Sequence, residues 1–305
     1  MGETELLKSL CEIHSPSGEE EFMKRFIIDY IKRYSSEWKQ KPVLIQGDHL
    51  QDCLILVFGQ PKVAAFAHMD TTGFTVRYQD QLIPIGGPEI DGNEILTGRD
   101  LYGEIECKIR MDDGHVHYIF GRAIAGGSSL VYKPDFSEEN LYFKSPYLDN
   151  RIGIYNLLRI AETLENGALV FSAWEEHGGG SVPFLVKRLF EDYGIHKMLV
   201  SDVTWISDGV SFNNGVVVSY RDKNIPRKSY INSIRSLLIE NKLEFQEEVE
   251  AYGSSDAREI QLSPYPIDWC FIGAPIENAH TNQEKIHKYD LHSMISCYKI
   301  LMKNL

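Results

Sequence analysis

The segment Phe171-Ser172-Ala173-Trp174-Glu175-Glu176-His177-Gly178-Gly179-Gly180 leads from an apolar run into two adjacent acids and a glycine-rich turn. Residues 168–174 are predicted to form a buried strand, because the run is short, apolar and bounded by turn residues. In an open α/β sheet, reactive side chains lie just beyond the carboxyl ends of the strands. We therefore expect Glu175 and Glu176 at such an end, in a chain where strands alternate with helices.

Four other polar residues have the same local setting, at the end of a predicted strand or beside one. They are His68, Asp149, Asp202 and His280. Predicted strands cover residues 63–67, 197–201 and 267–273, and a predicted helix covers residues 150–165. Because the ends of neighbouring parallel strands meet at one edge of a sheet, we expect the whole set to converge in one cavity.

Each of these motifs alone has a simpler structural explanation. His68-Met69-Asp70 fits a surface histidine beside a helix-capping aspartate, and Asp149 fits the N-cap of its helix. Glu175-Glu176 fits a solvated acidic turn. Together, however, two imidazoles and three carboxylates suit a pair of divalent ions, and burying adjacent carboxylates is costly unless cations compensate them. The joint pattern favours a paired-metal centre and predicts a hydrolase.

The metal interpretation gives each residue of the set a role. The predicted ligands are His68, Asp149, Glu176, Asp202 and His280. Glu175 is left as the general base, and Asp149 is expected to bridge the two ions through its two oxygens. Asp70 is predicted to hydrogen-bond the second ring nitrogen of His68 and to fix its tautomer. His177 follows Glu176 directly, so its side chain is expected to point away, into a loop.

Composition narrows the class of protein. The chain has 305 residues, 43% hydrophobic and 25% charged, which is typical of a globular protein. No apolar run approaches the ~20 residues of a membrane span, and the acidic N-terminus lacks a signal-peptide pattern. A formal net charge of −13 argues against a nucleic-acid partner. Five scattered cysteines are expected to be reduced, partly buried thiols, so the predicted location is the cytoplasm.

The pattern of predicted secondary structure changes between residues 77 and 143. Short β-like runs there are separated by glycine-rich turns, and Asp113-Gly114 between two runs predicts a hairpin. We expect a small β-rich insert at residues 77–143 and one α/β domain formed by residues 1–76 and 144–305. The predicted fold is a three-layer αβα sandwich with a mixed, mostly parallel central sheet, closed by a helix over residues 288–302.

These motifs together resemble one known family. The chain is similar to the glutamyl aminopeptidases, also called deblocking aminopeptidases or cellulase M proteins, which are two-metal exopeptidases. The motifs that carry the resemblance are Ala67-His68-Met69-Asp70, Leu148-Asp149-Asn150-Arg151-Ile152-Gly153, Glu175-Glu176 with its glycine turn, Asp202-Val203-Thr204, Ser255-Asp256-Ala257 and His280. The resemblance extends over nearly the whole chain.

The resemblance implies a metallopeptidase domain that hydrolyses N-terminal residues from peptides through water activated by two ions. It implies one ion at His68, Asp149 and Asp202 and a second at Asp149, Glu176 and His280. Glu175 would act as general acid and base. Zinc is the expected metal, with cobalt or manganese as alternatives. The resemblance also implies a homo-oligomer in which the insert helps the subunits associate and shapes the substrate pocket.

Two other functions stay open. A carboxypeptidase or N-acyl-amino-acid deacylase could use the same metal set, and it would need a cation to hold the substrate carboxylate. The candidate cations in the insert are Arg99, Arg110 and Arg122. The second alternative is a catalytically silent assembly protein of the same fold. The preferred N-terminal residue is not predicted, but an acidic one would need a basic pocket, with candidates at Arg221, Lys223, Arg227 and Arg258.

Overall fold

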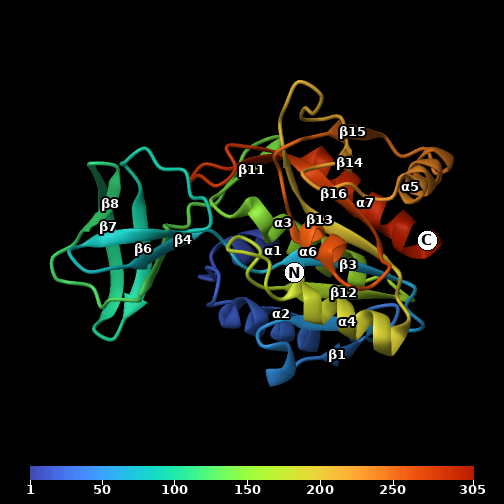
Figure 1. Ribbon diagram of the computed structural model, residues 1–305, viewed down its shortest axis with the longest axis horizontal. Helices are drawn as coiled ribbons and strands as arrows, with labels where there is room; N and C mark the ends of the chain where they lie inside the picture. Colours follow the sequence, from blue (N-terminus) through green and yellow to red (C-terminus); the bar gives the residue numbers. More distant parts are fainter.

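A mixed sheet of eleven strands forms the larger part of the protein, and a closed barrel of six strands projects from one end (Figure 1). The structure is a computed structural model that describes residues 1–305. Helices cover both faces of the large sheet. The predicted three-layer sandwich with a small β-rich insert is therefore confirmed.

Four neighbouring strands at the centre of the sheet are parallel. In spatial order they are β12 (Gly167–Ser172), β3 (Val63–His68), β13 (Lys197–Trp205) and β16 (Asp268–Glu277). Strands β12 and β3 are buried along their whole length, because helices pack on both faces and exclude water from both sides. Since the four strands are parallel neighbours, their carboxyl ends lie at one edge of the sheet.

The strands on either side are mainly antiparallel. Beyond β12 lie β2 (Leu54–Phe58) and β1 (Val43–Ile45), and beyond β16 lie β17 (Lys285–His287), β11 (Tyr142–Lys144) and β10 (Ser137–Glu138). Strand β14 (Val216–Arg221) also pairs with β16, and β15 (Phe245–Val249) pairs in parallel with β14. The parallel part of the sheet is thus the central part, and β14 with β15 forms a branch next to it.

Helices bury the two faces of the sheet under separate hydrophobic cores. One face is covered by α1 (Glu3–Cys11), α2 (Glu21–Tyr34), α3 (Leu148–Ala161), α5 (Lys228–Glu240) and α7 (Lys288–Asn304). The opposite face is covered by α4 (Val182–Tyr193) and α6 (Asp256–Leu262). A short 3-10 helix, η1 (Asp48–Leu50), precedes β2. The last helix begins at residue 288, as the sequence predicts.

The barrel is built from six short antiparallel strands. They are β4 (Gly73–Val76), β5 (Gln81–Ile85), β6 (Ile95–Asp100), β7 (Gly103–Asp112), β8 (His115–Ile119) and β9 (Ser129–Tyr132). Alternate side chains fill its interior: in β7, Ile105, Cys107 and Ile109 are buried, whereas the residues between them are exposed. Asp113 and Gly114 form the turn between β7 and β8, both with positive φ, which confirms the predicted hairpin.

The ends of the barrel do not coincide with the predicted limits of the insert. Strand β4 lies before residue 77 and belongs to the barrel. Strand β10 lies before residue 143 and belongs to the large sheet. The barrel strands thus run from residue 73 to residue 132, and the domain limits at residues 77 and 143 stay a prediction.

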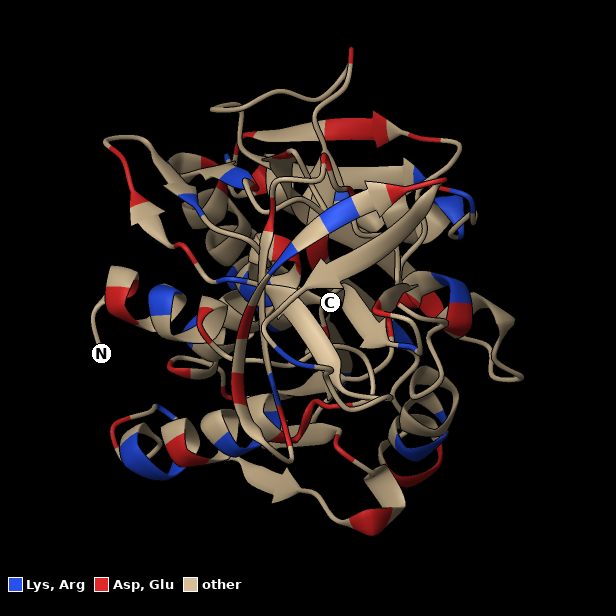
Figure 2. Ribbon diagram, turned by 90° about the vertical axis from the view of Figure 1, so that its left-hand side faces the viewer, with Lys and Arg blue, Asp and Glu red and all other residues tan.

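Charged residues of both signs are spread over the surface. In the view of Figure 2, Lys and Arg residues are interspersed with Asp and Glu residues and form no continuous basic area. All five cysteines are unpaired and buried. No helix combines the length and the apolar character that crossing a bilayer requires.

Candidate functional site

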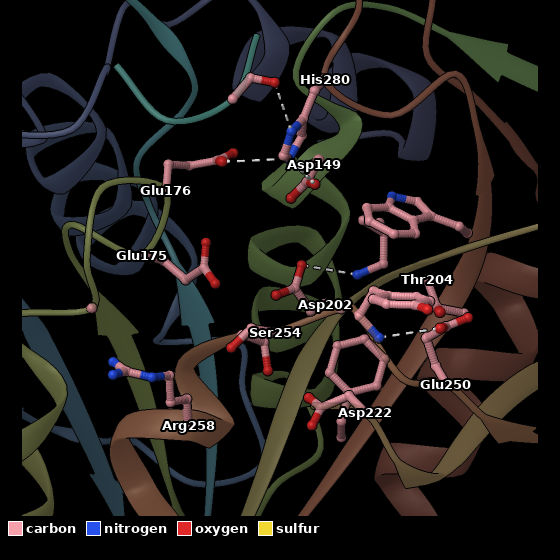
Figure 3. Close-up of a pocket in the computed structure, with 18 of the residues that line it drawn as sticks. Asp149, Glu175, Glu176, Asp202, Thr204, Asp222, Glu250, Ser254, Arg258 and His280 are labelled. Atoms are coloured by element: carbon pink, nitrogen blue, oxygen red, sulfur yellow. Dashed lines mark hydrogen bonds and ion pairs between the residues drawn. The ribbon is translucent and has the colours of Figure 1, made fainter. Parts of the chain in front are cut away.

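The carboxyl ends of the four parallel strands bring the predicted site residues together. His68 is the last residue of β3, and Asp202 lies in the second half of β13. Glu175 and Glu176 come shortly after the end of β12, and His280 follows β16. In Figure 3, the labelled members of this set point into one cavity. The predicted convergence is therefore present in the structure.

His68, Asp149 and Asp202 form one compact group of metal-ligand types. His68 Nε2 lies 3.3 Å from Asp149 Oδ1 and 3.6 Å from Asp202 Oδ1. All three residues are buried. One potential ligand atom from each lies within 4.8 Å of the others, so the three could hold a single ion.

A second group consists of Asp149, Glu176 and His280. His280 Nε2 lies 3.4 Å from Asp149 Oδ2 and 3.4 Å from Glu176 Oε2. The ligand atoms of this group also lie within 4.8 Å of one another. Asp149 belongs to both groups and faces one histidine with each oxygen, which is the arrangement that a bridging carboxylate needs.

Asp149 is held at the start of α3 without capping the helix. Asn150 Oδ1 accepts a hydrogen bond from the N–H of Gly153 at 2.9 Å, and Asn150 Nδ2 donates to the carbonyl of Ser201 at 2.9 Å. The backbone dihedral angles of Asp149 and Asn150 are not helical. Asn150 thus provides the helix cap that was the simpler explanation for Asp149, and the Asp149 carboxylate is left to face the two histidines.

Asp70 anchors the turn that carries the adjacent acids. Its two carboxylate oxygens accept hydrogen bonds from the backbone N–H groups of Glu175 and Glu176, each at 3.0 Å. Ser17 Oγ donates a further bond to Asp70 Oδ2 at 2.6 Å. His68 Nδ1 lies 3.2 Å from the backbone carbonyl of Asp70 and 3.5 Å from its Oδ1. Asp70 therefore faces the second nitrogen of His68, but mainly through its backbone.

Glu175 stands beside the donor groups without belonging to either. Its Oε2 lies 3.8 Å from His68 Nε2, which is beyond hydrogen-bond distance. The side chain is 15% exposed and borders the cavity. A carboxylate that is close to the donors and still reaches the cavity has the position that a general base requires.

The clustered acids are buried with too little positive charge around them. Burial raises the pKa of Glu175 well above its ordinary value and raises the pKa of Glu176 to about 8. Burial also raises the pKa of Asp202. In each case desolvation penalises the ionised form more than the nearby histidines stabilise it. Divalent cations at the two donor groups would stabilise the ionised carboxylates, so the residues present fit metal ions.

The same acids raise the pKa of the two histidines and so favour the charged form of each imidazole. Burial lowers the pKa of His280, but Asp149 and Glu176 outweigh it and raise the pKa to about 11. Burial also raises the pKa of Asp149, yet hydrogen bonds from His280 and His68 dominate and lower it below its ordinary value. Imidazoles in this setting behave as the cations of the cluster, a part that metal ions would take over.

Glu284 is a buried acid that no sequence pattern singles out. Its Oε1 accepts a hydrogen bond from the N–H of His280 at 2.8 Å, and its Oε2 accepts one from the N–H of Asp149 at 3.0 Å. The carboxylate therefore joins the backbone segments of two predicted ligands. Because Asp149 lies 135 positions earlier in the chain, no local motif could have revealed this contact.

The remaining histidines lie outside both donor groups. They are His14, His49, His115, His117, His177, His196, His287 and His292. His177 Nδ1 accepts a hydrogen bond from the N–H of Gly86 at 3.1 Å, so its side chain faces the loop after β5, in line with its expected loop position. His287 precedes α7, where its Nδ1 accepts from the N–H of Tyr289.

A cavity of about 350 Å³ opens beside the donor groups. Its size is that of a small-ligand site. Asp149, Glu175, Glu176, Asp202 and His280 border one part of it. The other part is bordered by β13, by the segment after β14, by β15 and the segment after it, and by α6. Its residues include Thr204, Asp222, Glu248, Glu250 and Arg258. Figure 3 shows both parts.

Comparisons with known proteins agree with this arrangement. The sequence profile of the M42 glutamyl aminopeptidase family matches residues 121–296. The TET1 peptidase of Pyrococcus horikoshii has a similar structure, with a TM-score of 0.84, 20% identity and 100% of each chain covered. An aminopeptidase of the archaeon Desulfurococcus kamchatkensis gives a TM-score of 0.87 at 19% identity, covering 99% of this chain and 95% of that one.

A third similar structure comes from a bacterium. The Thermotoga maritima protein described as an endoglucanase gives a TM-score of 0.76 at 18% identity, covering 97% of this chain and 96% of that one. At identities this low, the likeness to solved structures shows the fold.

Proposed function

Because the chain belongs to the M42 glutamyl aminopeptidase family, whose profile covers more than half of it, we propose that it is a metal-dependent aminopeptidase. Its substrates are peptides with a free N-terminus, from which it removes residues one at a time. The observation that carries this proposal is the pair of donor groups that share Asp149, with Glu175 beside them in one cavity.

Two divalent ions are the proposed cofactors. His68, Asp149 and Asp202 would hold one ion, and Asp149, Glu176 and His280 would hold the other. Imidazole nitrogens and carboxylate oxygens suit zinc, with cobalt or manganese as alternatives. When bound, the ions polarise the peptide carbonyl and lower the pKa of water to about 7.

Glu175 is the proposed general acid and base. Its carboxylate borders the cavity, so it can accept a proton from the attacking water and deliver it to the leaving amine of the peptide. Asp70 acts as a positioning residue, because its two oxygens hold the backbone N–H groups of Glu175 and Glu176. A base fixed in this way needs little reorganisation during the reaction.

The protein is also proposed to work as a homo-oligomer. The TET1 peptidase of Pyrococcus horikoshii is described as assembling into a tetrahedron or a large octahedral shell. In this chain, the turn between β6 and β7 exposes Leu101 and Tyr102, with 94% and 75% of their surface accessible. An apolar tip on a projecting element is available for contact with another subunit, so the insert at residues 77–143 is the proposed association element. Light scattering of the purified protein tests this.

The carboxypeptidase and deacylase alternative needs a free cation near the metal donors. The insert arginines are instead paired with carboxylates: Arg99 with Glu104, Arg110 with Asp112 and Arg122 with Asp100. None of the three borders the cavity. This supports the aminopeptidase over its closest rival.

A direct comparison of two peptides tests the proposal. One has a free N-terminus, and the other is the same peptide with an acetylated N-terminus. We expect zinc-loaded protein to shorten the free peptide from its N-terminus and to leave the acetylated one intact. Release of acetate or of C-terminal residues would favour the rival. No hydrolysis of either peptide by protein with a full metal complement would favour a catalytically silent protein.

A further inference from the structure

The cavity continues beyond the metal donors into a second acidic region. We call it the distal region and define it by Asp222, Glu248, Glu250, Arg258 and Glu259. In Figure 3, Asp222 and Glu250 lie on the side of the cavity away from Glu176 and His280. The distal region contains four carboxylates and a single guanidinium, so its charge is strongly negative.

Asp222 and Glu248 are the buried acids of the distal region. Each is only 7% exposed, and what remains exposed borders the cavity. Asp222 accepts a hydrogen bond from the backbone N–H of Asn224, and Glu248 accepts one from Thr204 Oγ1. Neither forms an ion pair, although an unpaired buried carboxylate is costly. Burial accordingly raises the pKa of both carboxyl groups.

Two neighbouring polar atoms are also left without partners. Ser219 lies opposite Glu248 in the pairing of β14 with β15, and its buried Oγ forms no hydrogen bond. Asn224 follows Asp222 closely in the chain, and its Nδ2 is likewise buried and unbonded. Neither Ser219 nor Asn224 borders the cavity, and neither carries a charge, so the two buried acids gain no cationic partner from them.

One cation of the chain pairs with one carboxylate of the distal region and leaves the other three without an ion pair. Arg258, its only basic residue, pairs with Glu259. Arg227 pairs with Asp268, and Arg221 donates through Nε to the backbone carbonyl of Asp222 at 3.1 Å. Neither Arg221, Lys223 nor Arg227 borders the cavity. Of the four candidates for a basic pocket, only Arg258 borders the cavity, and it is paired with Glu259.

The apolar residues of the cavity lie close to this acidic region. Val203 and Trp205 flank Thr204, whose hydroxyl binds Glu248, while Tyr252 and Phe271 complete the apolar lining. A lysine or arginine side chain has the same two parts, since an aliphatic stem carries a cation at its end. The stem can pack on the apolar lining while the cation reaches Asp222 and Glu248.

An aminopeptidase must place the side chain of the first residue close to the reacting carbonyl, because both groups are bonded to the same α-carbon. We propose that the distal region binds the side chain of this first residue and selects lysine or arginine. The proposal rests on the aminopeptidase function proposed above. An acidic first residue would meet the unpaired carboxylates of Asp222 and Glu248, and like charges in a buried site repel strongly.

Four p-nitroanilide substrates test the proposal, with lysine, norleucine, leucine and glutamate as the amino acid. Norleucine has the chain length of lysine but no ammonium group. Charge-assisted hydrogen bonds are strong enough that we expect kcat/KM for lysine to exceed that for norleucine by about tenfold or more. We expect glutamate to be the poorest of the four. Equal values for lysine and norleucine, or preference for glutamate, would overturn the proposal.

Variants locate the selectivity in the distal region. Asp222→Asn and Glu248→Gln keep side-chain size, and each should reduce the ratio of lysine to norleucine several-fold. Glu247→Gln is the matched control, because Glu247 neighbours Glu248 on β15 but pairs with Arg235 outside the cavity. It should leave the ratio unchanged. A ratio that neither distal variant alters would contradict the assignment.

The same measurements separate the two proposals. Hydrolysis of leucine and norleucine substrates without lysine selectivity would refute the selectivity alone. Hydrolysis of none of the four by metal-loaded protein would refute the aminopeptidase function. Calorimetry with free lysine and free norleucine does not depend on turnover. Binding of lysine about tenfold more tightly, with the difference lost in Asp222→Asn, supports the distal region as a cation site, and equal binding excludes it.

Discussion

The cavity and the barrel use the same charged residue types in opposite ways. In the barrel, Arg110 and Asp112 pair at 3.0 Å with about half of each side chain in water, at 48% and 61% exposure. In the cavity, the side chains of Glu176 and Asp202 are almost fully buried, and a histidine is the ion-pair partner of each. In a surface pair, the two charges balance each other and water screens both. A buried excess of negative charge is not balanced within the chain and needs a partner from outside it.

This difference distinguishes charged residues that serve a function from charged residues that only keep the surface in contact with water. Exposed barrel charges such as Arg110 and Asp112 could be exchanged with little consequence, because solvent screens them. The cavity contains two acidic sets of different character: one has the geometry of metal donors, and the other is the proposed site for a substrate side chain. The contrast predicts that single substitutions will have graded effects, depending on which region they alter.

Asp149→Asn should have the largest effect. The change preserves the size of the side chain but removes the charge that both donor groups share. Metal ions typically contribute several kcal/mol to catalysis, and each 1.4 kcal/mol is about tenfold. We expect kcat/KM on an aminoacyl substrate to fall by roughly a thousandfold or more, with loss of bound metal. Near-normal activity would show that removing a charge from the cavity matters no more than removing one from the barrel.

Glu175→Gln should have the next largest effect. It removes the proposed base but none of the donors, so metal content measured by mass spectrometry should stay at the wild-type level. General-base catalysis is typically worth a hundredfold or more, and we expect kcat to fall by about that factor. Full activity would exclude Glu175 from the reaction.

Glu284→Gln should act through metal affinity. The charge that holds the backbone of Asp149 and His280 is lost, although the side-chain shape is kept. Groups that support metal ligands usually change affinity by about 10- to 100-fold. Competition with a chelating dye measures this, and activity at saturating zinc should return close to the wild-type value. A defect that excess zinc does not restore would assign Glu284 a different role.

Arg110→Ala should have the smallest effect. Exposed pairs contribute about 0–1 kcal/mol, so the free energy of unfolding should change by no more than about that amount. Denaturant titration measures the change, and kcat/KM should stay within about twofold of wild type. A large loss of activity would show that barrel charges are not local and would weaken the comparison.

The sequence predicted the fold and the convergence of the site because both depend on local signals. Apolar runs indicated the central strands, and polar residues directly after them indicated the edge where they meet. His68 could be located in this way, since it ends β3, whereas the strand that was expected to end before Asp202 continues to Trp205. The hairpin at Asp113-Gly114 was predictable for a similar reason, because two adjacent residues determine the conformation of its turn.

The contacts that the sequence did not reveal join distant segments. Asn150, rather than Asp149, caps α3 because it also reaches the carbonyl of Ser201 on β13. Glu284 and the distal acids likewise depend on strands that pair only in the folded chain. Periodicity cannot show which buried acid has no partner, since pairing is a property of the tertiary structure.

Anomalous diffraction from crystals soaked in zinc tests the central claim most directly. We expect two peaks, one among His68, Asp149 and Asp202 and the other among Asp149, Glu176 and His280. In the His280→Ala variant, the second peak should be weaker than the first or absent, because His280 belongs only to the second donor group. Absence of both peaks, or zinc bound only elsewhere on the protein, would contradict the account.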